Sequence, residues 1–169
     1  MAYLAAERVN HVLGEVPEWV PVRLDEPGPF RCAEEVLAYQ EDVARAARAQ
    51  EVQPLRWPEP FPADSEFAML VATYAKQIGR AVAFSLAALR QAFAGGRDLG
   101  ERDTVLIAAA ACEMHPAAVV KGAELGSIAR RLDEATAAAA TAGVLDVPAI
   151  VMPNGRVFHG DRELEAAAA

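Results

Sequence analysis

Residues 143–164 read GVLDVPAIVMPNGRVFHGDREL and contain the signals of a helix end, two strands and a new helix. Gly143 follows an alanine-rich run and suits the left-handed position just beyond a helix. Val147-Pro148 opens the apolar run 149–152, and the first residue of a strand is one of the few places where a sheet tolerates proline. The segment therefore predicts a helix that stops, followed by a strand that starts at a proline.

The second half of the stretch predicts a return strand and a final helix. Asn154-Gly155 is typical of a two-residue hairpin turn with positive φ at both central positions. Residues 156–159 would then form the return strand. Gly160-Asp161 would cap a helix over 162–168, because a short side-chain oxygen can accept from the free N–H groups of a helix start.

The bulk composition favours a folded, largely helical chain. It has 169 residues, of which 53% are hydrophobic, and much of that share is alanine. This length suits one domain, or a core with an insertion, and is enough to bury a hydrophobic core. Lys and Arg number 16 against 24 Asp and Glu, so the net charge of −8 disfavours nucleic acid or an anionic membrane surface as partner. No apolar run has the length that spans a membrane.

The first residues and the cysteines favour a cytoplasmic protein. Residues 1–8 lack the basic-then-apolar order of a signal peptide. Cys32 and Cys112 lie too far apart for a CxxC redox pair, and they do not have the spacing of a zinc site. We therefore expect two reduced thiols and no bound metal.

The N-terminal part predicts a helix and then a strand. Apolar residues at helical spacing indicate a helix over 3–13. The alternation of Val20, Val22 and Leu24 indicates a strand, and Pro21 places that strand at a sheet edge. A charged, alanine-rich helix is expected over 31–50.

A proline-rich loop follows at 53–62. Its four prolines exclude a helix and favour an extended path. Trp57 and Phe61 lie within it. These two rings either staple the loop to the body of the protein or line a cleft.

The middle of the chain is predicted to be helical. A long helical tract covers 64–94, with Gly79 as a joint inside it. Shorter helices are expected over 104–112 with Asp103 as cap, from His115-Pro116 to 124, and over 127–141.

This order of elements predicts an α/β protein with a thioredoxin-like core. A helix and strand at one end and a hairpin and helix at the other are the two halves of such a core. The predicted core comprises residues 1–28 and 127–169. Residues 29–126 would form an all-helical insertion.

Motifs on both sides of the hairpin resemble those of the DsbA-like thioredoxin family. Gly143-Val-Leu-Asp-Val-Pro-Ala is similar to the family's G-V-x-G-V-P-[TA], and Phe158-His-Gly-Asp-Arg-Glu-Leu is similar to F-x-G-x-D-R-L-E. The closer resemblance is to the branch of 2-hydroxychromene-2-carboxylate isomerases and kappa-class glutathione transferases. It covers nearly the whole chain and includes Tyr3-Leu-Ala-Ala-Glu-Arg, Trp57-Pro58, Phe61-Pro62 and Gly96-Arg-Asp-Leu.

The resemblance implies a glutathione site at the hairpin. Val147 would pair its backbone with the cysteinyl part of glutathione, as a short added strand. Pro148 would be a cis proline. Asp161, together with the N–H groups near Gly160, would hold the γ-glutamyl end, where a carboxylate can meet the ammonium group of the ligand.

Two further residues near these motifs could affect the bound ligand. Asp146 stands where the family usually has glycine, which changes the shape and charge beside the ligand. His159 is a candidate for lining the cleft with Trp57 and Phe61. It is either a half-exposed residue at a strand end or a modulator of a bound thiolate.

The family's reactive group has no counterpart in these motifs. In relatives a first strand and a loop precede the helix that begins with Tyr-Leu-Ala. That loop holds a serine in the isomerases or a CxxC in the dithiol enzymes, where a helix N-terminus stabilises a thiolate. Here this position would precede Met1, so we assign no catalytic residue and expect the first central strand of the core to be missing.

Three functions follow from the resemblance and remain open. The first is a glutathione-dependent isomerase or transferase that acts on a small electrophile of aromatic origin. The second is a DsbA-like thiol–disulfide oxidoreductase. The third is a non-catalytic scaffold that binds a peptide-like ligand or a partner strand at the Val147 edge, which would also permit a homodimer.

Overall fold

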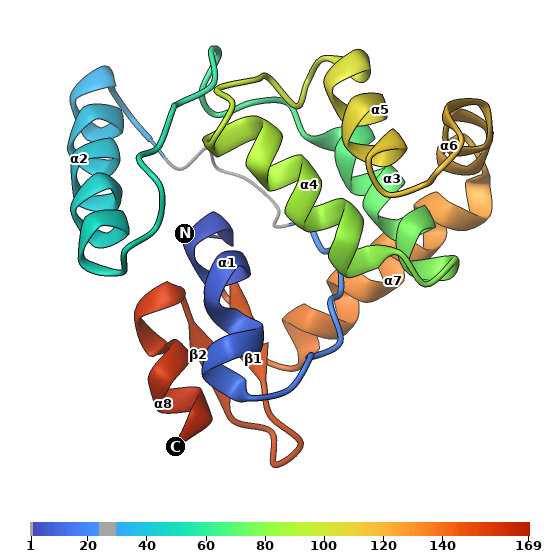
Figure 1. Cartoon of the computed structure of the whole chain (residues 1–169). Helices are drawn as coiled ribbons and strands as arrows, with labels where there is room; N and C mark the ends of the chain where they lie inside the picture. Colours follow the sequence, from blue (N-terminus) through green and yellow to red (C-terminus); the bar gives the residue numbers. More distant parts are fainter. Residues whose placement is uncertain (1, 24–29) are drawn as a thin grey trace.

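The computed structural model describes residues 2–23 and 30–169 and is mostly helical. Figure 1 shows a small hairpin with a short helix at one end of the molecule and a group of packed helices at the other. The helices in chain order are α1 (Ala2–Leu13), α2 (Ala33–Ala49), α3 (Glu66–Gln77), α4 (Ala81–Phe93), α5 (Arg102–Ala110), α6 (Pro116–Ala123), α7 (Gly126–Thr141), the 3₁₀ helix η1 (Asp161–Glu163) and α8 (Leu164–Ala168). Among the described residues, none of them is both long enough and apolar enough to cross a bilayer.

The predicted hairpin is confirmed. Its strands are β1 (Ala149–Val151) and β2 (Val157–His159), which pair antiparallel. Ala149 lies opposite His159, and Val151 lies opposite Val157. Phe158 is buried in the middle of β2, so the hairpin packs one face against the body of the protein.

The predicted two-residue turn is wrong. The φ angle is +83° at Gly155 but is not positive at Asn154. The Gly155 N–H donates to the Met152 carbonyl at 2.9 Å, and the Met152 N–H donates to the Arg156 carbonyl at 2.9 Å. The loop is therefore the three-residue type, a turn followed by a glycine in the left-handed region, and Pro153 suits the second position of that turn.

The predicted edge strand over 20–24 is not formed. Residues 18–23 belong to no strand, and Leu24 lies outside the described residues. The Arg23 N–H instead donates to Thr136 Oγ1 of α7 at 3.0 Å. The described sheet has only the two hairpin strands, so this segment has no neighbouring strand with which to pair.

The helical tract over 64–94 is two helices. Gly79 takes a φ of +74° between α3 and α4, as expected of a joint. Helix α5 begins before the predicted position, with Glu101 at the N-cap and no side-chain cap bond. Asp103 is consequently inside the first turn rather than at the cap, where its charge still favours the helix dipole.

Two hydrophobic clusters hold the helices together. The larger joins α3, α4, α5 and α6 around the fully buried Phe84, Val71 and Val105. The smaller surrounds Tyr3 and Leu4 of α1 and includes Val43 of α2. The predicted division into core and insertion stays a prediction, although the larger cluster lies wholly within the predicted insertion.

Helix α1 connects the two ends of the molecule. It packs against α8 on the hairpin side and against α4 on the helical side (Figure 1). Arg90 of α4 donates two hydrogen bonds to the Glu7 carboxylate of α1, both at 2.7 Å. The hairpin is therefore held to the helical part through α1.

Helices α3 and α6 approach closely at Gly122, which gives a stability prediction. A Cβ atom there would lie 2.5 Å from Cδ2 of Tyr74. We expect Gly122→Ala to lower the free energy of unfolding by about 1–2 kcal/mol, because the overpacking outweighs the roughly 1 kcal/mol that alanine gains in a helix. Urea unfolding measures this change.

Gly126→Ala is the matched control for that substitution. A Cβ at Gly126 would meet only the far end of Arg130, at 3.6 Å. We expect this variant to be as stable as the wild type or slightly more stable. A Gly122→Ala protein that unfolds at the wild-type urea concentration would contradict the close approach.

Candidate functional site

The two motifs of the predicted site meet at the start of the hairpin. The Gly160 N–H donates to the Pro148 carbonyl at 2.7 Å, which extends the strand pairing by one residue. The Val147–Pro148 bond is cis, as the resemblance implies. Val147-Pro148 and Gly160-Asp161 therefore form one surface, although they are far apart in the sequence.

Asp161 is buried, with 7% of its surface exposed. Its Oδ2 accepts from Nε2 of Gln50 at 2.9 Å. Burial alone would raise the pKa of the Asp161 carboxyl. The interactions of the carboxylate, which include hydrogen bonds from Gln50 and from its own backbone, outweigh burial and lower the pKa. The group is therefore a buried carboxylate in its charged form at neutral pH.

The predicted capping role of Asp161 is wrong. Gly160, with a φ of +78°, is the N-cap of η1, and no side chain caps it. Asp161 is the first residue of η1, and α8 begins only at Leu164. The Oδ2 of Asp161 accepts from Gln50, and the N-cap position itself belongs to Gly160, the other residue of the predicted capping pair.

Gln50 is a site residue that the sequence analysis missed. It is the C-cap residue of α2, where its backbone N–H donates to the Ala46 carbonyl. Its Oε1 is buried and has no hydrogen-bond partner among the described residues. A buried acceptor without a donor beside a buried carboxylate is a feature that a bound cationic group would satisfy.

The lowered pKa of Asp161 predicts acid-sensitive stability. A carboxyl whose pKa is lower in the folded than in the unfolded state stabilises the fold above its ordinary pKa, and this stabilisation is lost as the pH falls. We expect the free energy of unfolding to fall between about pH 5 and pH 3 more steeply in the wild type than in Asp161→Asn. Parallel urea-unfolding curves across that range would contradict this account of Asp161.

The Val147 N–H is not free to pair with a ligand, although the resemblance implies it to be. This N–H donates to Oδ1 of the preceding Asp146 at 2.7 Å. Val147 is 40% exposed, so the residue lies at the surface. The site is accessible at this position, but its N–H already has an acceptor.

His159 is held by two hydrogen bonds. Its Nε2 accepts from the Leu145 N–H at 3.1 Å, and its own N–H donates to Oε2 of Glu163 at 2.7 Å. The imidazole is half-buried and connects the end of β2 to the loop that leads into Val147. These contacts favour a positioning role over direct action on a thiolate, which stays a prediction.

Trp57 and Phe61 belong to a cluster of half-buried rings. Their ring centroids are 4.8 Å apart, and Trp57 also contacts Phe93 of α4 at 5.7 Å and Tyr39 of α2 at 6.0 Å. The Arg56 N–H donates to the Phe93 carbonyl at 2.8 Å. The rings therefore staple the proline loop to α2 and α4, and a role in lining a cleft stays a prediction.

Tyr39 connects this aromatic cluster to the hairpin site, and the sequence analysis missed it. Burial raises the pKa of the Tyr39 hydroxyl, and the negative charges of Asp146 and Asp161 raise it further. Both carboxylates thus lie close enough to Tyr39 to affect its ionisation.

The two thiols are separate. Cys32 is exposed at the N-cap of α2, and Cys112 is buried after α5. Burial raises the pKa of the Cys112 thiol. The part of the chain that the structure describes contains no group of three or more residues that could hold a metal ion.

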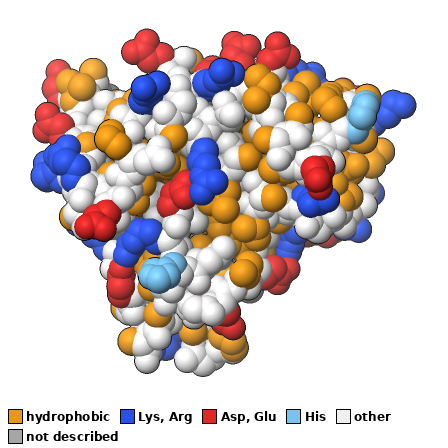
Figure 2. All heavy atoms as spheres, viewed as in Figure 1, with side chains coloured by type: hydrophobic (Ala, Val, Ile, Leu, Met, Phe, Trp, Pro, Cys, Tyr) orange, Lys and Arg blue, Asp and Glu red, His pale blue; other side chains and the backbone are white. Residues whose placement is uncertain are grey.

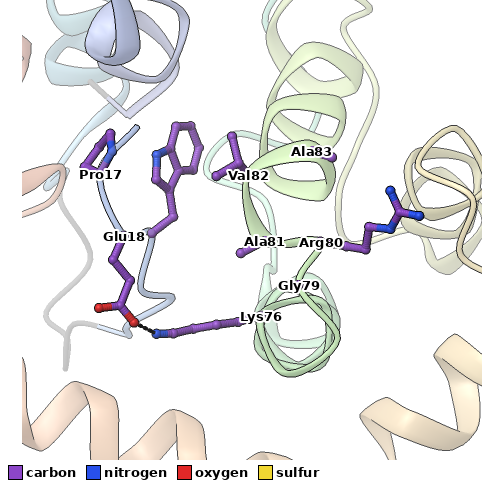
Figure 3. A pocket seen from close by; sticks show the side chains of 9 residues that line it. Pro17, Glu18, Lys76, Gly79, Arg80, Ala81, Val82 and Ala83 are labelled. Atoms are coloured by element: carbon purple, nitrogen blue, oxygen red, sulfur yellow. Dashed lines mark hydrogen bonds and ion pairs between the residues drawn. The ribbon is translucent and has the colours of Figure 1, made fainter. Parts of the chain in front are cut away.

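A surface pocket of about 530 Å³ lies elsewhere, between residues 17–19 and the corner of α3 and α4. Trp19 is among its lining residues, and Figure 3 shows an ion pair between Glu18 and Lys76 there. None of the residues assigned to the hairpin site lines it. It takes no part in the predicted site.

The charges on the displayed face are mixed. Figure 2 shows acidic and basic side chains interspersed with apolar patches. The basic side chains do not gather into a stripe on this face. This distribution agrees with the acidic net charge and does not resemble a nucleic-acid-binding surface.

Comparison with known proteins places the fold. Residues 2–169 match the family described as DSBA-like thioredoxin domain. The chain belongs to this family. The DSBA-like assignment confirms the predicted thioredoxin-like fold with its helical part, and no curated protein matches the sequence.

A solved structure of this DSBA-like fold is similar over almost the whole chain. It is a 2-hydroxychromene-2-carboxylate isomerase, with a TM-score of 0.83 and 18% sequence identity. The alignment covers 98% of this chain and 86% of that one. The likeness concerns the fold and agrees with the isomerase branch expected from the hairpin motifs.

Proposed function

We propose that the chain binds glutathione at the hairpin and belongs to a glutathione-dependent isomerase or transferase acting on a small electrophile. The observation that carries this proposal is the buried Asp161 carboxylate beside Gln50. The isomerase-like fold supports it. When bound, glutathione would supply a thiolate that adds reversibly to an electrophilic carbon of the substrate.

The Asp161 end suits the γ-glutamyl group. The ammonium of that group has three N–H donors and a positive charge. Asp161 offers a charged acceptor, and Oε1 of Gln50 is a buried acceptor without a donor. The two together would bind an ammonium group more strongly than either would alone, because charge-assisted hydrogen bonds are the stronger kind.

The Val147 end suits the peptide part of the ligand. Extended peptides bind sheet edges through main-chain hydrogen bonds. The bond between Gly160 and Pro148 brings this edge next to Asp161, so one extended tripeptide would reach both ends. His159 would hold the loop before Val147 in position through Leu145.

The aromatic cluster would bind the apolar part of the electrophile. Tyr39 contacts Trp57 and Phe61 and is close to both acidic residues of the hairpin site. A planar ring would stack on such side chains with favourable energy. The substrate would then lie between the rings and the ligand thiol.

Calorimetric titration tests the proposal with two ligands. We expect heat of binding with glutathione and much weaker binding with N-acetylglutathione, whose γ-glutamyl nitrogen is an amide and carries no charge. Equal affinity for both ligands would exclude the Asp161 contact. No heat and no thermal shift with either ligand at millimolar concentration would overturn the proposal.

A further inference from the structure

The loop that leads into the hairpin is closed by its own side chains. Asp146 Oδ1 accepts from the Val147 N–H at 2.7 Å, and the neighbouring Leu145 N–H donates to His159 at 3.1 Å. Asp146 itself is exposed to solvent. Two backbone donors at the edge of the site, those of Leu145 and Val147, are thus already bonded within the chain.

We propose that Asp146 is a specificity-determining residue that occupies the Val147 amide and admits a peptide ligand only when its carboxylate is displaced. The inference rests on the proposed function, because it concerns the same site. A ligand carbonyl that pairs with Val147 must replace an ionised acceptor at 2.7 Å. A charged acceptor holds an N–H more strongly than a neutral carbonyl does.

The charge of Asp146 also limits the kind of ligand. Asp146 contacts the Val147 N–H, and the hydrogen bond from Gly160 to Pro148 places Asp161 beside the same segment. A ligand that places a negative group near Val147 would therefore face two carboxylates. Once displaced, Asp146 would favour a ligand with an N–H or a positive charge at that position.

Two substitutions separate the hydrogen bond of Asp146 from its charge, and a third is a control. Asp146→Ala removes both the acceptor and the charge, whereas Asp146→Asn removes the charge and keeps an oxygen that can accept from Val147. We expect glutathione to bind about fivefold more tightly to Asp146→Ala than to the wild type, and the gain for Asp146→Asn to be less than about twofold. Asp133→Ala, on α7 where the carboxylate pairs with Arg23 and contacts no residue of the hairpin site, is the control for surface charge and should leave the affinity unchanged.

Amide hydrogen exchange of Val147 gives a readout that needs no ligand. We expect slower exchange in the wild type than in Asp146→Ala, and an intermediate rate in Asp146→Asn. Equal exchange rates in the wild type and Asp146→Ala would overturn the inference.

The affinities distinguish the inference from the function on which it rests. Wild-type binding that Asp146→Ala does not tighten would overturn the role of Asp146 and leave the proposed function standing. Equal gains for the alanine and asparagine variants would show that only charge acts, and would overturn the claim that Asp146 occupies the amide. Absence of glutathione binding in the wild type and in every variant would overturn the proposed function itself.

Discussion

Asp161→Ala should weaken glutathione binding about thirtyfold, the loss expected when one charge-assisted contact is removed from a buried site. The carboxylate is 7% exposed and has a lowered pKa, so it is negative and poorly solvated at neutral pH. An ammonium group of the ligand beside it would add a charge-assisted hydrogen bond to the carboxylate. Calorimetry of the wild type and the variant measures the difference.

The ligand pair identifies the origin of that loss. N-acetylglutathione lacks the charged nitrogen, so Asp161→Ala should change its affinity little. A double-mutant cycle of protein and ligand then isolates the contact between Asp161 and the ammonium group. A loss of equal size for both ligands would show that the substitution acts through the fold instead.

His159→Ala is the control within the same site. His159 contacts Leu145 and Glu163 and lies opposite Ala149 at the start of the hairpin. We expect its removal to weaken glutathione binding less than Asp161→Ala does, because it would position the loop without touching the γ-glutamyl group. Equal losses in the two variants would mean that the ligand is placed wrongly.

Phe84→Ala should lower the free energy of unfolding by about 4 kcal/mol, the largest stability effect expected of a single substitution in this chain. Phe84 is 1% exposed and packs in the cluster that joins α3, α4, α5 and α6. Alanine there would leave a cavity that rigid helices fill only in part. Urea unfolding followed by circular dichroism measures the change.

Ile107→Ala on α5 is the control for the loss of apolar surface. Its side chain is 45% exposed, so we expect a change of less than about 1 kcal/mol. The cluster that contains Phe84 includes no residue of the hairpin motifs, so the folded Phe84→Ala protein should keep its affinity for glutathione. A loss of less than about 1 kcal/mol in Phe84→Ala would contradict the description of this core.

The helices and the hairpin were predictable because their signals are local. Helical spacing of apolar residues identified α1, and Pro116 after His115 identified the start of α6, where His115 Nδ1 accepts from the Ala117 N–H at 3.3 Å. The turn type was predicted incorrectly because Asn154-Gly155 was interpreted without Pro153. Proline fixes φ near −65° and suits the second position of the turn that forms.

The site was predictable only in part. Asp161 and Pro148 belong to motifs that can be read along the chain, but Gln50 comes from the end of a helix 111 positions away. No local pattern indicates that contact, because the fold brings the C-cap of α2 next to the start of η1. The strand predicted over 20–24 is not formed for a similar reason, since alternation produces a strand only where a neighbouring strand is available for pairing.

The most direct test of the central claim is a titration of ¹⁵N-labelled protein with glutathione, followed by amide chemical shifts. We expect the largest shifts at Val147, Gly160 and Asp161, together with the side-chain amide of Gln50. Asp161→Ala should remove the shift of the Gln50 side chain. Shifts centred on Trp19 and Val82 at the other pocket, or no shifts at millimolar glutathione, would contradict a glutathione site at the hairpin.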